Sequence, residues 1–260
     1  MKIEPAKGTR TFDFRRSRYE HLKNFNVLRS LVVAKSGSGK TVLLQQLILN
    51  VFRDPQGKSI FERVYIFSPT ALTDTVWEPV LKFCRKELNH PEDEPGPLID
   101  EWREDVLQKI VADQKLLIDY EKSHPKEFHN KLHQILIVID DWASDESVMR
   151  GKKGQILKEL YLRGRHFGIN LIVSVQKWKL ASTVMRTQAT SVFYFRAGSL
   201  TDLDDFLENF SALVPGGKKA LMQIYRAATA EPYSFLTVDL LQQDPNRIFM
   251  KRFDSYLTVE

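Results

Sequence analysis

The chain has 260 residues, of which 43% are hydrophobic and 27% are charged, and this balance excludes wholesale disorder. A single cysteine excludes an intrachain disulfide framework, and the length suits one large α/β domain or two small ones. The formal net charge of +5 permits a nucleic-acid partner without requiring one. Because no apolar run approaches roughly 18 residues and the first residues are charged, we expect neither a transmembrane segment nor a signal peptide.

Short apolar runs rich in β-branched residues alternate with helix-like stretches, a pattern typical of an α/β protein with a largely parallel sheet. We predict strands over residues 31–34, 64–67, 135–139, 170–175 and 191–195. These runs are almost uniformly apolar, as expected of strands covered on both faces. We predict helices over residues 41–52, 76–88, 101–120 and 155–162. Residues 221–225 and 234–238 are expected to extend the sheet, as a hairpin.

A glycine-rich phosphate loop is predicted at residues 34–41, which read Ala-Lys-Ser-Gly-Ser-Gly-Lys-Thr. The segment follows an apolar strand and opens a helix, and it fits G-x-x-x-x-G-K-[ST] except that Ala34 replaces the first glycine. Glycines at this spacing let backbone N–H groups surround a phosphate, and the helix N-terminus adds partial positive charge. In such loops the lysine reaches the β- and γ-phosphates and the hydroxyl binds Mg²⁺. The candidate nucleotide-binding residues are therefore Ser36, Gly37, Ser38, Gly39, Lys40 and Thr41.

Two carboxylates follow the apolar strand over residues 135–139 directly. Strand ends of an open α/β sheet face the ligand crevice, so Asp140 is a candidate Mg²⁺ ligand together with Thr41. Asp141 is a candidate to orient or deprotonate the attacking water, and Glu146 is the alternative for this role. The next predicted strand ends in Gln176, whose amide is a candidate sensor of the γ-phosphate or of the water. A simpler interpretation is that Asp140 and Asp141 cap a turn and that Gln176 satisfies loop backbone.

The order of these motifs resembles the poxvirus-type genome-packaging ATPases of the FtsK–HerA superfamily. The resemblance covers roughly residues 25–240. It is carried by Ser-Gly-Ser-Gly-Lys-Thr, by the apolar strand ending in Asp-Asp, by Gly-Arg-His-Phe-Gly-Ile at 164–169 before the strand that ends in Gln176, by Met185-Arg186, and by the strand at 191–196. It implies a three-layer P-loop NTPase fold of the additional-strand, RecA-like type. Its central sheet would be mainly parallel, with a C-terminal sheet extension.

The resemblance also implies a division of the chain and a set of partners. We expect a basic N-terminal arm over residues 1–24 and a P-loop ATPase domain over residues 25–260, with a helical segment at about 71–130 inserted between strands. The implied cofactors are ATP and Mg²⁺, and the implied partner is double-stranded DNA bound without regard to sequence. Such a motor would form a pentameric or hexameric ring, act at a capsid or portal vertex, and work in the virion or the host cytoplasm, with no membrane.

Ring ATPases often complete each site with an arginine from the neighbouring subunit. The order of preference here is Arg165, then Arg163, then Arg186, and the alternative is that these arginines pair with Asp145, Glu146 or Glu159. Candidate DNA contacts are Lys152, Lys153, Lys177, Lys179, Lys218 and Lys219, each of which is equally explained as a solvated surface lysine. The arginine-rich start of the chain, at residues 10–18, is a further candidate.

Other functions remain open at this point. A cellular or plasmid DNA translocase of the same superfamily would share all of these motifs. A P-loop phosphotransferase would share Lys40 and Thr41 and would need an acceptor pocket and an arginine-rich lid. A nucleotide-gated regulatory module also stays open, because the short Asp141 stands where related ATPases usually carry Glu. Stimulation of hydrolysis by DNA distinguishes the translocases from the other two.

Overall fold

The computed structural model describes residues 12–19, 22, 27–91, 95–142, 145–149 and 151–258. Within these residues, nine strands form one sheet in the order β3-β2-β4-β5-β1-β6-β7-β8-β9. The parallel strands are β1 (Arg29–Val33), β2 (Arg63–Phe67), β3 (Leu98–Ile99), β4 (Ile135–Ile139), β5 (Ile169–Val175) and β6 (Ser191–Phe195). The antiparallel strands are β7 (Phe235–Asp239), β8 (Phe249–Lys251) and β9 (Ser255–Tyr256). All five strands predicted from the apolar runs before residue 196 are confirmed.

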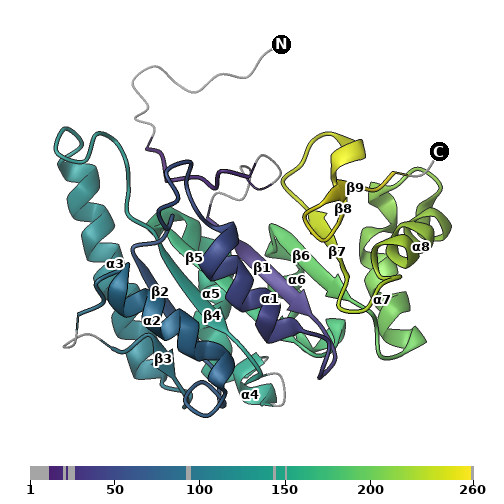
Figure 1. Cartoon of the computed structure of the whole chain (residues 1–260), viewed down its shortest axis with the longest axis horizontal. Helices are drawn as coiled ribbons and strands as arrows, with labels where there is room; N and C mark the ends of the chain where they lie inside the picture. The colour runs from purple at the N-terminus through teal and green to yellow at the C-terminus, as the bar shows by residue number, and fades with distance from the viewer. Residues whose placement is uncertain are drawn as a thin grey trace.

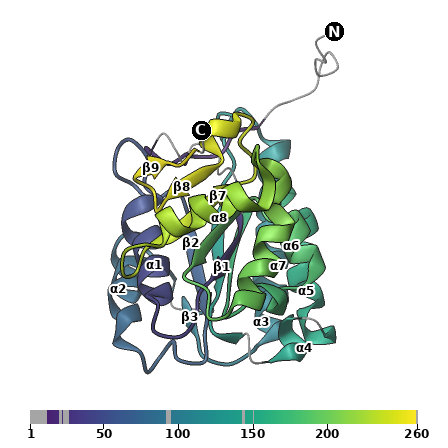
Figure 2. The same cartoon turned by 90° about the vertical axis from the view of Figure 1, so that its right-hand side faces the viewer.

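Helices cover both faces of this sheet, which gives three layers (Figures 1 and 2). One face carries α1 (Lys40–Gln46), its π-helical continuation η2 (Leu47–Val51) and α2 (Glu78–Lys86). The other carries α3 (Glu104–Ser123), α4 (Glu146–Met149), α5 (Gln155–Arg163), α6 (Thr183–Gln188), α7 (Leu200–Phe210) and α8 (Gly217–Ala228). Short 3₁₀ turns lie at Thr75–Trp77, Lys152–Gly154, Gly164–Phe167, Trp178–Leu180, Ser211–Leu213 and Pro245–Arg247.

The uniformly apolar strands are explained by this double cover. In β1, Leu31 and Val33 pack into the core under α3 to α8, whereas Val32 packs into the core under α1 and α2. Successive side chains of a strand point to opposite faces, so both sets must be apolar when both faces are covered.

The strand order confirms the predicted fold class. β5 lies between β1, which leads into the glycine-rich loop, and β4, which ends before Asp140. This inserted strand defines the additional-strand type of P-loop fold, and β7 to β9 form the expected C-terminal extension at one end of the sheet (Figure 1).

One predicted strand is wrong. Residues 221–225 lie inside helix α8, and only the second segment, as β7, joins the sheet. The buried residues of α8 are Ala220, Leu221, Ile224, Tyr225 and Ala228, and this spacing of one, four, five and eight residues is helical. The predicted segment Leu-Met-Gln-Ile-Tyr at 221–225 is too short to show that period, which appears once Ala220 and Ala228 on either side are included.

The described part of the N-terminal arm packs against the body of the domain. Arg15 forms an ion pair with Glu62 at 3.3 Å, and the Ser17 hydroxyl donates to the carbonyl of Val51 at 2.9 Å. Arg10 lies outside the described residues. Between β2 and β4 the chain forms α2 and α3, and the two-residue strand β3 joins the edge of the sheet. Among the described helices, none has the length and apolarity needed to cross a bilayer.

Candidate active site

The glycine-rich loop lies at the carboxyl end of β1 and leads directly into α1. Gly37 and Gly39 have φ angles of 74° and 87°, in the left-handed region that glycine adopts without steric cost. Gly39 is the residue that precedes α1, and Gly37 has no atom within 4 Å of the position that a Cβ would take. Its open backbone therefore leaves room for a phosphate above the N-terminus of α1.

Lys40 connects this loop to the two aspartates after β4. Its Nζ lies 3.1 Å from Asp140 Oδ1 and 2.5 Å from Asp141 Oδ1, and the residue is only 7% exposed. The structure thus brings together the lysine of the predicted phosphate loop and the predicted acidic pair, which are separated by about a hundred residues in the chain. An ammonium at these distances neutralises charge on both carboxylates.

Asp140 is the most buried acid of the group, at 1% exposure. Its Oδ1 accepts a hydrogen bond from the Ser174 hydroxyl, and its Oδ2 lies 3.4 Å from the Thr41 hydroxyl. A carboxylate and a hydroxyl side by side at a phosphate loop are the oxygen ligands with which Mg²⁺ is held beside nucleotide phosphates. The residues therefore fit the predicted magnesium site.

Asp141 has an unusual backbone conformation, with φ of 60°. Aspartate tolerates the left-handed region better than most residues, and the conformation turns the chain sharply at the end of β4. Its backbone N–H lies 3.3 Å from the Ser174 hydroxyl oxygen, and its side chain is 40% exposed. The carboxylate therefore faces both Lys40 and solvent, where a water molecule can reach it.

Ser174 is the residue of this site that the sequence interpretation missed. It is fully buried in β5, donates to Asp140 and accepts from the backbone of Asp141. The available signal was one hydroxyl in an otherwise apolar strand end, Ile-Val-Ser-Val.

The remaining predicted residues at this edge are Gln176 and Glu146. Gln176 follows β5 directly, is exposed, and lies between the strands that lead to Lys40 and to Asp140. Glu146 begins α4 and is exposed. Among the interactions of the described residues, no hydrogen bond or ion pair links Glu146 to Lys40, Asp140 or Asp141.

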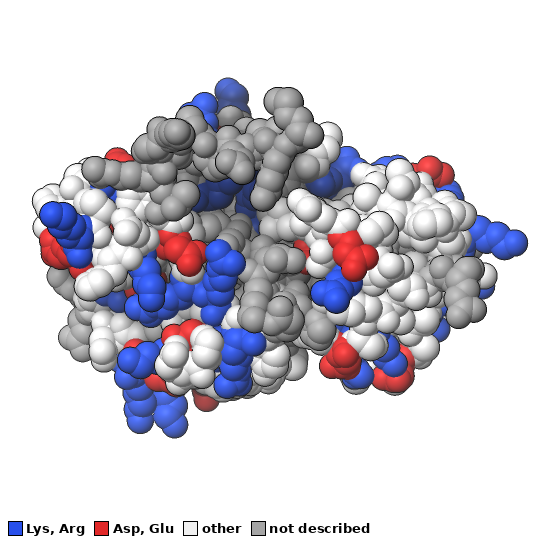
Figure 3. Space-filling view, turned by 90° about the horizontal axis from the view of Figure 1, so that it is seen from above, with Lys and Arg blue, Asp and Glu red and all other residues white. Residues whose placement is uncertain are grey.

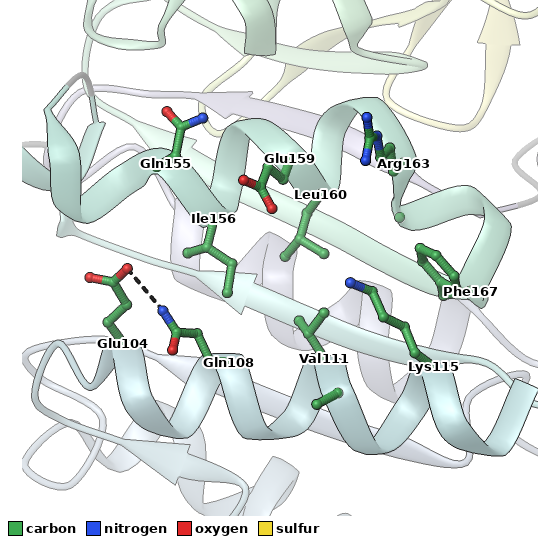
Figure 4. Close-up of a pocket in the computed structure, with 12 residues that line it drawn as sticks. Glu104, Gln108, Val111, Lys115, Gln155, Ile156, Glu159, Leu160, Arg163 and Phe167 are labelled. Atoms are coloured by element: carbon green, nitrogen blue, oxygen red, sulfur yellow. Dashed lines mark hydrogen bonds between the residues drawn. The ribbon is translucent and has the colours of Figure 1, made fainter.

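Arg163 and Arg165 lie at the amino-terminal ends of the parallel strands, opposite the ends that carry the phosphate loop. They precede β5, whereas the phosphate loop follows β1, and the two strands are parallel and adjacent. A strand of this length spans roughly 20 Å, so neither arginine reaches the loop of its own chain. Arg163 stands at the rim of a cavity between α3 and α5, where Lys115 lies over the ring of Phe167 (Figure 4).

Arg165 lies near a second arginine, Arg29. Burial, and after it the Arg165 guanidinium, lower the pKa of Arg29 at the start of β1. In the part of the chain that the structure describes, Arg163 and Arg165 form no ion pair with an acid. Arg186, the third candidate, lies in α6 with its guanidinium 5.9 Å from the Trp178 ring centre.

Three of the six lysines proposed to contact DNA are paired with acids. Lys179 contacts Asp205 at 2.7 Å, Lys218 contacts Asp204 and Glu208 at 2.6 Å each, and Lys153 lies 4.0 Å from Asp145. Lys152, Lys177 and Lys219 have no such contact among the described residues, and Lys177 is exposed beside Gln176. Trp178 is buried against Phe206 and Phe210, which anchors the loop that carries Lys177.

Two viral proteins are similar to this chain in sequence. No protein-family model matches the chain. Uncharacterized protein 075L of invertebrate iridescent virus 6 is 22% identical over 224 residues, which are 85% of this chain and 75% of that protein. Uncharacterized protein 015R of frog virus 3 is 25% identical over 113 residues, which are 44% of this chain and 33% of that protein.

Two solved structures carry the comparison of folds. The genome-packaging NTPase B204 of Sulfolobus turreted icosahedral virus 2 with ATPγS has a TM-score of 0.53 and 17% identity, over 84% of this chain and 94% of that one. The DNA-packaging ATPase B204 of Sulfolobus turreted icosahedral virus has a TM-score of 0.51 and 18% identity, over 81% and 91%. The resemblance to viral packaging ATPases is therefore confirmed at the level of the fold.

Proposed function

We propose that this chain is an ATPase that uses Mg²⁺-dependent ATP hydrolysis to translocate double-stranded DNA, and that its task is to package a genome into a viral capsid. The observation that carries the proposal is the convergence of Lys40, Thr41, Asp140 and Asp141 at the carboxyl edge of the sheet. The fold shared with proteins named as viral packaging ATPases supports the DNA-packaging part.

ATP would bind with its phosphates in the loop that contains Ser36, Gly37, Ser38 and Gly39. The N-terminus of α1 would stabilise their negative charge, and Lys40 would leave the aspartates to contact the β- and γ-phosphates. Thr41 and Asp140 would hold Mg²⁺, which when bound withdraws charge from the phosphoryl oxygens. Ser174 keeps Asp140 in place through its hydrogen bond.

Such a displacement of Lys40 would change the surroundings of Asp141. Their 2.5 Å contact occupies the carboxylate that would accept a proton from the attacking water. If Lys40 contacts phosphate instead, Asp141 would be free to orient that water, and Gln176, exposed directly after β5, is the further candidate for this role. The short Asp141 can then serve as the base because its left-handed backbone turns it toward the loop.

The arginines and the phosphate loop lie at opposite ends of the parallel strands, and this separation suggests how neighbouring subunits would cooperate. Arg165 or Arg163 lies too far from its own phosphate loop, and neither is neutralised by an acid among the described residues. In a pentameric or hexameric ring, one of them would neutralise transition-state charge in the neighbouring subunit, an effect worth about 10³–10⁵ in rate in related NTPases.

Double-stranded DNA would be held through its phosphates. The net charge is +5, and Lys and Arg side chains gather on the face seen from above, with Asp and Glu side chains between them (Figure 3). Lys152, Lys177 and Lys219 are the remaining lysine candidates. We further propose action at a capsid or portal vertex, in the virion or in the host cytoplasm.

The test is steady-state ATP hydrolysis with and without long double-stranded DNA. Lys40→Ala is the inactive reference, because it lacks the lysine proposed to contact the phosphates. Lys35→Ala is the matched control, because Lys35 is an exposed lysine of the same loop. We expect DNA of any sequence to stimulate hydrolysis in the wild type and in Lys35→Ala but not in Lys40→Ala. Hydrolysis that ignores DNA would contradict translocation and favour a phosphotransferase or a nucleotide-gated module. Equal activity in Lys40→Ala would contradict the site itself.

A further inference from the structure

Three aromatic side chains, Phe67, Trp102 and Trp142, form a row beside the acidic pair. The Trp142 ring packs edge-on against the Trp102 ring, with centres 5.7 Å apart, and the Trp102 ring packs against the Phe67 ring, with centres 6.1 Å apart. Phe67 is fully buried, and both tryptophans are partly buried against the same core. Trp142 directly follows Asp141, so this aromatic row ends beside the residue proposed as the general base.

The aromatic row joins segments that are far apart in the sequence. Phe67 ends β2 and Trp142 follows β4, and these two strands are paired with Phe67 opposite Ile139. Trp102 comes from the segment between β2 and β4, three residues after Ile99, which pairs with Phe67 as part of β3. Because β3 is parallel to β2, the chain that leaves β3 brings Trp102 to the carboxyl ends of β2 and β4. The two-residue strand β3 thus places a ring where Trp142 can pack against it.

The backbone of Asp141 needs support from its neighbours. Its φ of 60° lies in the left-handed region, and a residue other than glycine keeps that conformation only where the surrounding structure fixes it. On one side, the backbone N–H of Asp140 donates to the carbonyl of Phe67 at 2.9 Å. On the other side, the Trp142 ring packs against Trp102, which packs against the Phe67 ring. Both neighbours of Asp141 are therefore held at Phe67, one through its backbone and one through its side chain.

This support matters most when Lys40 is engaged elsewhere. In the structure, the Lys40 ammonium holds the Asp141 carboxylate at 2.5 Å. The proposed function moves Lys40 to the phosphates, so the carboxylate would lose that contact. The described residues would then hold Asp141 through the hydrogen bond of its backbone N–H to the Ser174 hydroxyl and through the packing of Trp142. Because a misplaced reacting group can lower the rate about 10²-fold, the turn at Asp141 must stay fixed at this stage.

We propose that Trp102 and Trp142 are positioning residues for the general base, an inference that rests on the proposed function because that function assigns the base to Asp141. Trp142 fixes the turn, and Trp102 fixes Trp142. The Nε1 atoms of both indoles are buried and have no hydrogen-bond acceptor among the residues that the structure describes. The rings therefore act through packing, since a buried donor without an acceptor does not stabilise the fold. Phenylalanine in place of tryptophan should keep the effect, and alanine should not.

The experiment compares Trp102→Ala and Trp102→Phe with wild type, because Trp102 is remote in sequence from the acidic pair. Trp102→Leu is a second, milder variant that keeps an apolar side chain. Single-turnover hydrolysis with long double-stranded DNA gives the rate of the chemical step. Calorimetric titration gives the Kd of a non-hydrolysable ATP analogue, and urea unfolding gives the free energy of unfolding.

Phe128→Ala is the matched control for loss of aromatic packing. Phe128 is partly buried, and its ring packs edge-on against His133 with centres 6.0 Å apart. His133 precedes β4, whereas Asp140 follows it, so this contact lies at the other end of the strand. Phe128→Ala should lose free energy of unfolding and keep the single-turnover rate within about twofold of wild type.

Trp102→Ala and Trp102→Leu should lower the single-turnover rate about 10–100-fold, while the Kd of the analogue changes less than about threefold. Trp102→Phe should stay within about threefold of the wild-type rate. In the Asp141→Asn background, Trp102→Ala should lower the rate by less than about a further twofold, because a positioning residue acts only through the group that it positions.

A wild-type rate in Trp102→Ala would overturn this inference alone. An equal loss of rate with and without Asp141→Asn would overturn it too, as would a loss of nucleotide binding that parallels the loss of rate, since the role of Trp102 would then be structural. If Asp141→Asn alone hydrolyses ATP at the wild-type rate, the assignment of the general base fails and this inference fails with it. A wild-type chain that does not hydrolyse ATP would overturn the proposed function and this inference together.

Discussion

Two buried aspartates each end an apolar strand of the same sheet, and their surroundings differ. Asp140 follows β4 and Asp239 ends β7, and each is 1% exposed. Asp140 contacts the Lys40 ammonium, the Ser174 hydroxyl and the Thr41 hydroxyl. Asp239 accepts from the backbone N–H of Leu241 at 2.9 Å and has no cationic partner among the described residues.

Strand direction explains the difference. β4 is parallel to β5 and ends at the edge where the phosphate loop lies. β7 is antiparallel to β6, so that Asp239 pairs with Ser191 at the beginning of β6 and lies at the opposite edge. An apolar run followed by aspartate therefore indicates a ligand site only when the strand runs in the same direction as the strand before the phosphate loop.

The first prediction tests Asp141, next to Asp140, as the general base of ATP hydrolysis. In Asp141→Asn the side chain keeps its shape and loses its ability to accept a proton, so the kcat of ATP hydrolysis should fall about 10²–10⁴-fold, as for loss of a general base. The Kd of ATP should change only a few-fold, because the phosphate loop is untouched. Paired measurements of single-turnover hydrolysis and ATP binding check this.

Glu146→Gln is the matched control for that measurement. Glu146 is exposed at the start of α4, and no polar contact with the site is seen in the described part of the chain. Its kcat should stay within about twofold of wild type. If instead Glu146→Gln loses activity and Asp141→Asn keeps it, the general base is Glu146. The ion pair between Lys40 and Asp141 would then not mark the base.

Much of this arrangement can be predicted from sequence because it is local. The loop at Gly37 and Gly39, the apolar strands and the pair Asp140-Asp141 are each encoded in a few consecutive residues, and parallel strands bring their carboxyl ends to one edge. The non-local contacts were not predictable. Ser174 looked like an ordinary strand residue, and its role depends on the pairing of β4 with β5.

The C-terminal extension shows the same limit. Residues 221–225 alone form an apolar run compatible with a strand, whereas the helical spacing shows only over the longer segment from Ala220 to Ala228, which packs against the sheet face as α8. Strands β3, β8 and β9 have two or three residues each, too few to carry a periodic pattern. Their pairing partners stabilise them, and those partners lie far away in the chain.

The second prediction concerns Asp239. Burial raises the pKa of its carboxyl to about 6 from an ordinary value of 3.8. The folded chain therefore binds this proton more tightly than the unfolded chain, so the contribution of Asp239 to the free energy of unfolding decreases as the pH rises from about 4 to 6. Relative to Asp239→Asn, wild type should lose about 1–2 kcal/mol between pH 4 and pH 7.5.

Urea unfolding of both proteins at the two pH values measures this difference, with the exposed Asp119→Asn as control. Asp119→Asn should follow wild type at both pH values. An equal loss of stability in wild type and in Asp239→Asn would show that the buried carboxyl does not titrate in this range. Asp239 would then have a cationic partner as Asp140 does, and the contrast between the two aspartates would not hold.

The third prediction tests whether Ser174 positions the acidic pair. Ser174→Ala removes the hydrogen bond to Asp140 Oδ1 and frees the backbone N–H of Asp141, so kcat should fall about tenfold, equivalent to roughly 1.5 kcal/mol for a hydrogen bond to a charged group. Ser30→Ala is the matched control, because Ser30 is equally buried in the neighbouring strand β1 and, among the described residues, its hydroxyl bonds to the Ser191 hydroxyl and to no carboxylate. Both variants lose one buried hydroxyl and should lose similar free energy of unfolding. Only Ser174→Ala should lose turnover, since only its hydroxyl contacts a carboxylate of the site. Equal kcat values in the two variants would mean that Ser174 contributes to the sheet and not to the chemistry, and the difference between Asp140 and Asp239 would then depend on Lys40 and Thr41.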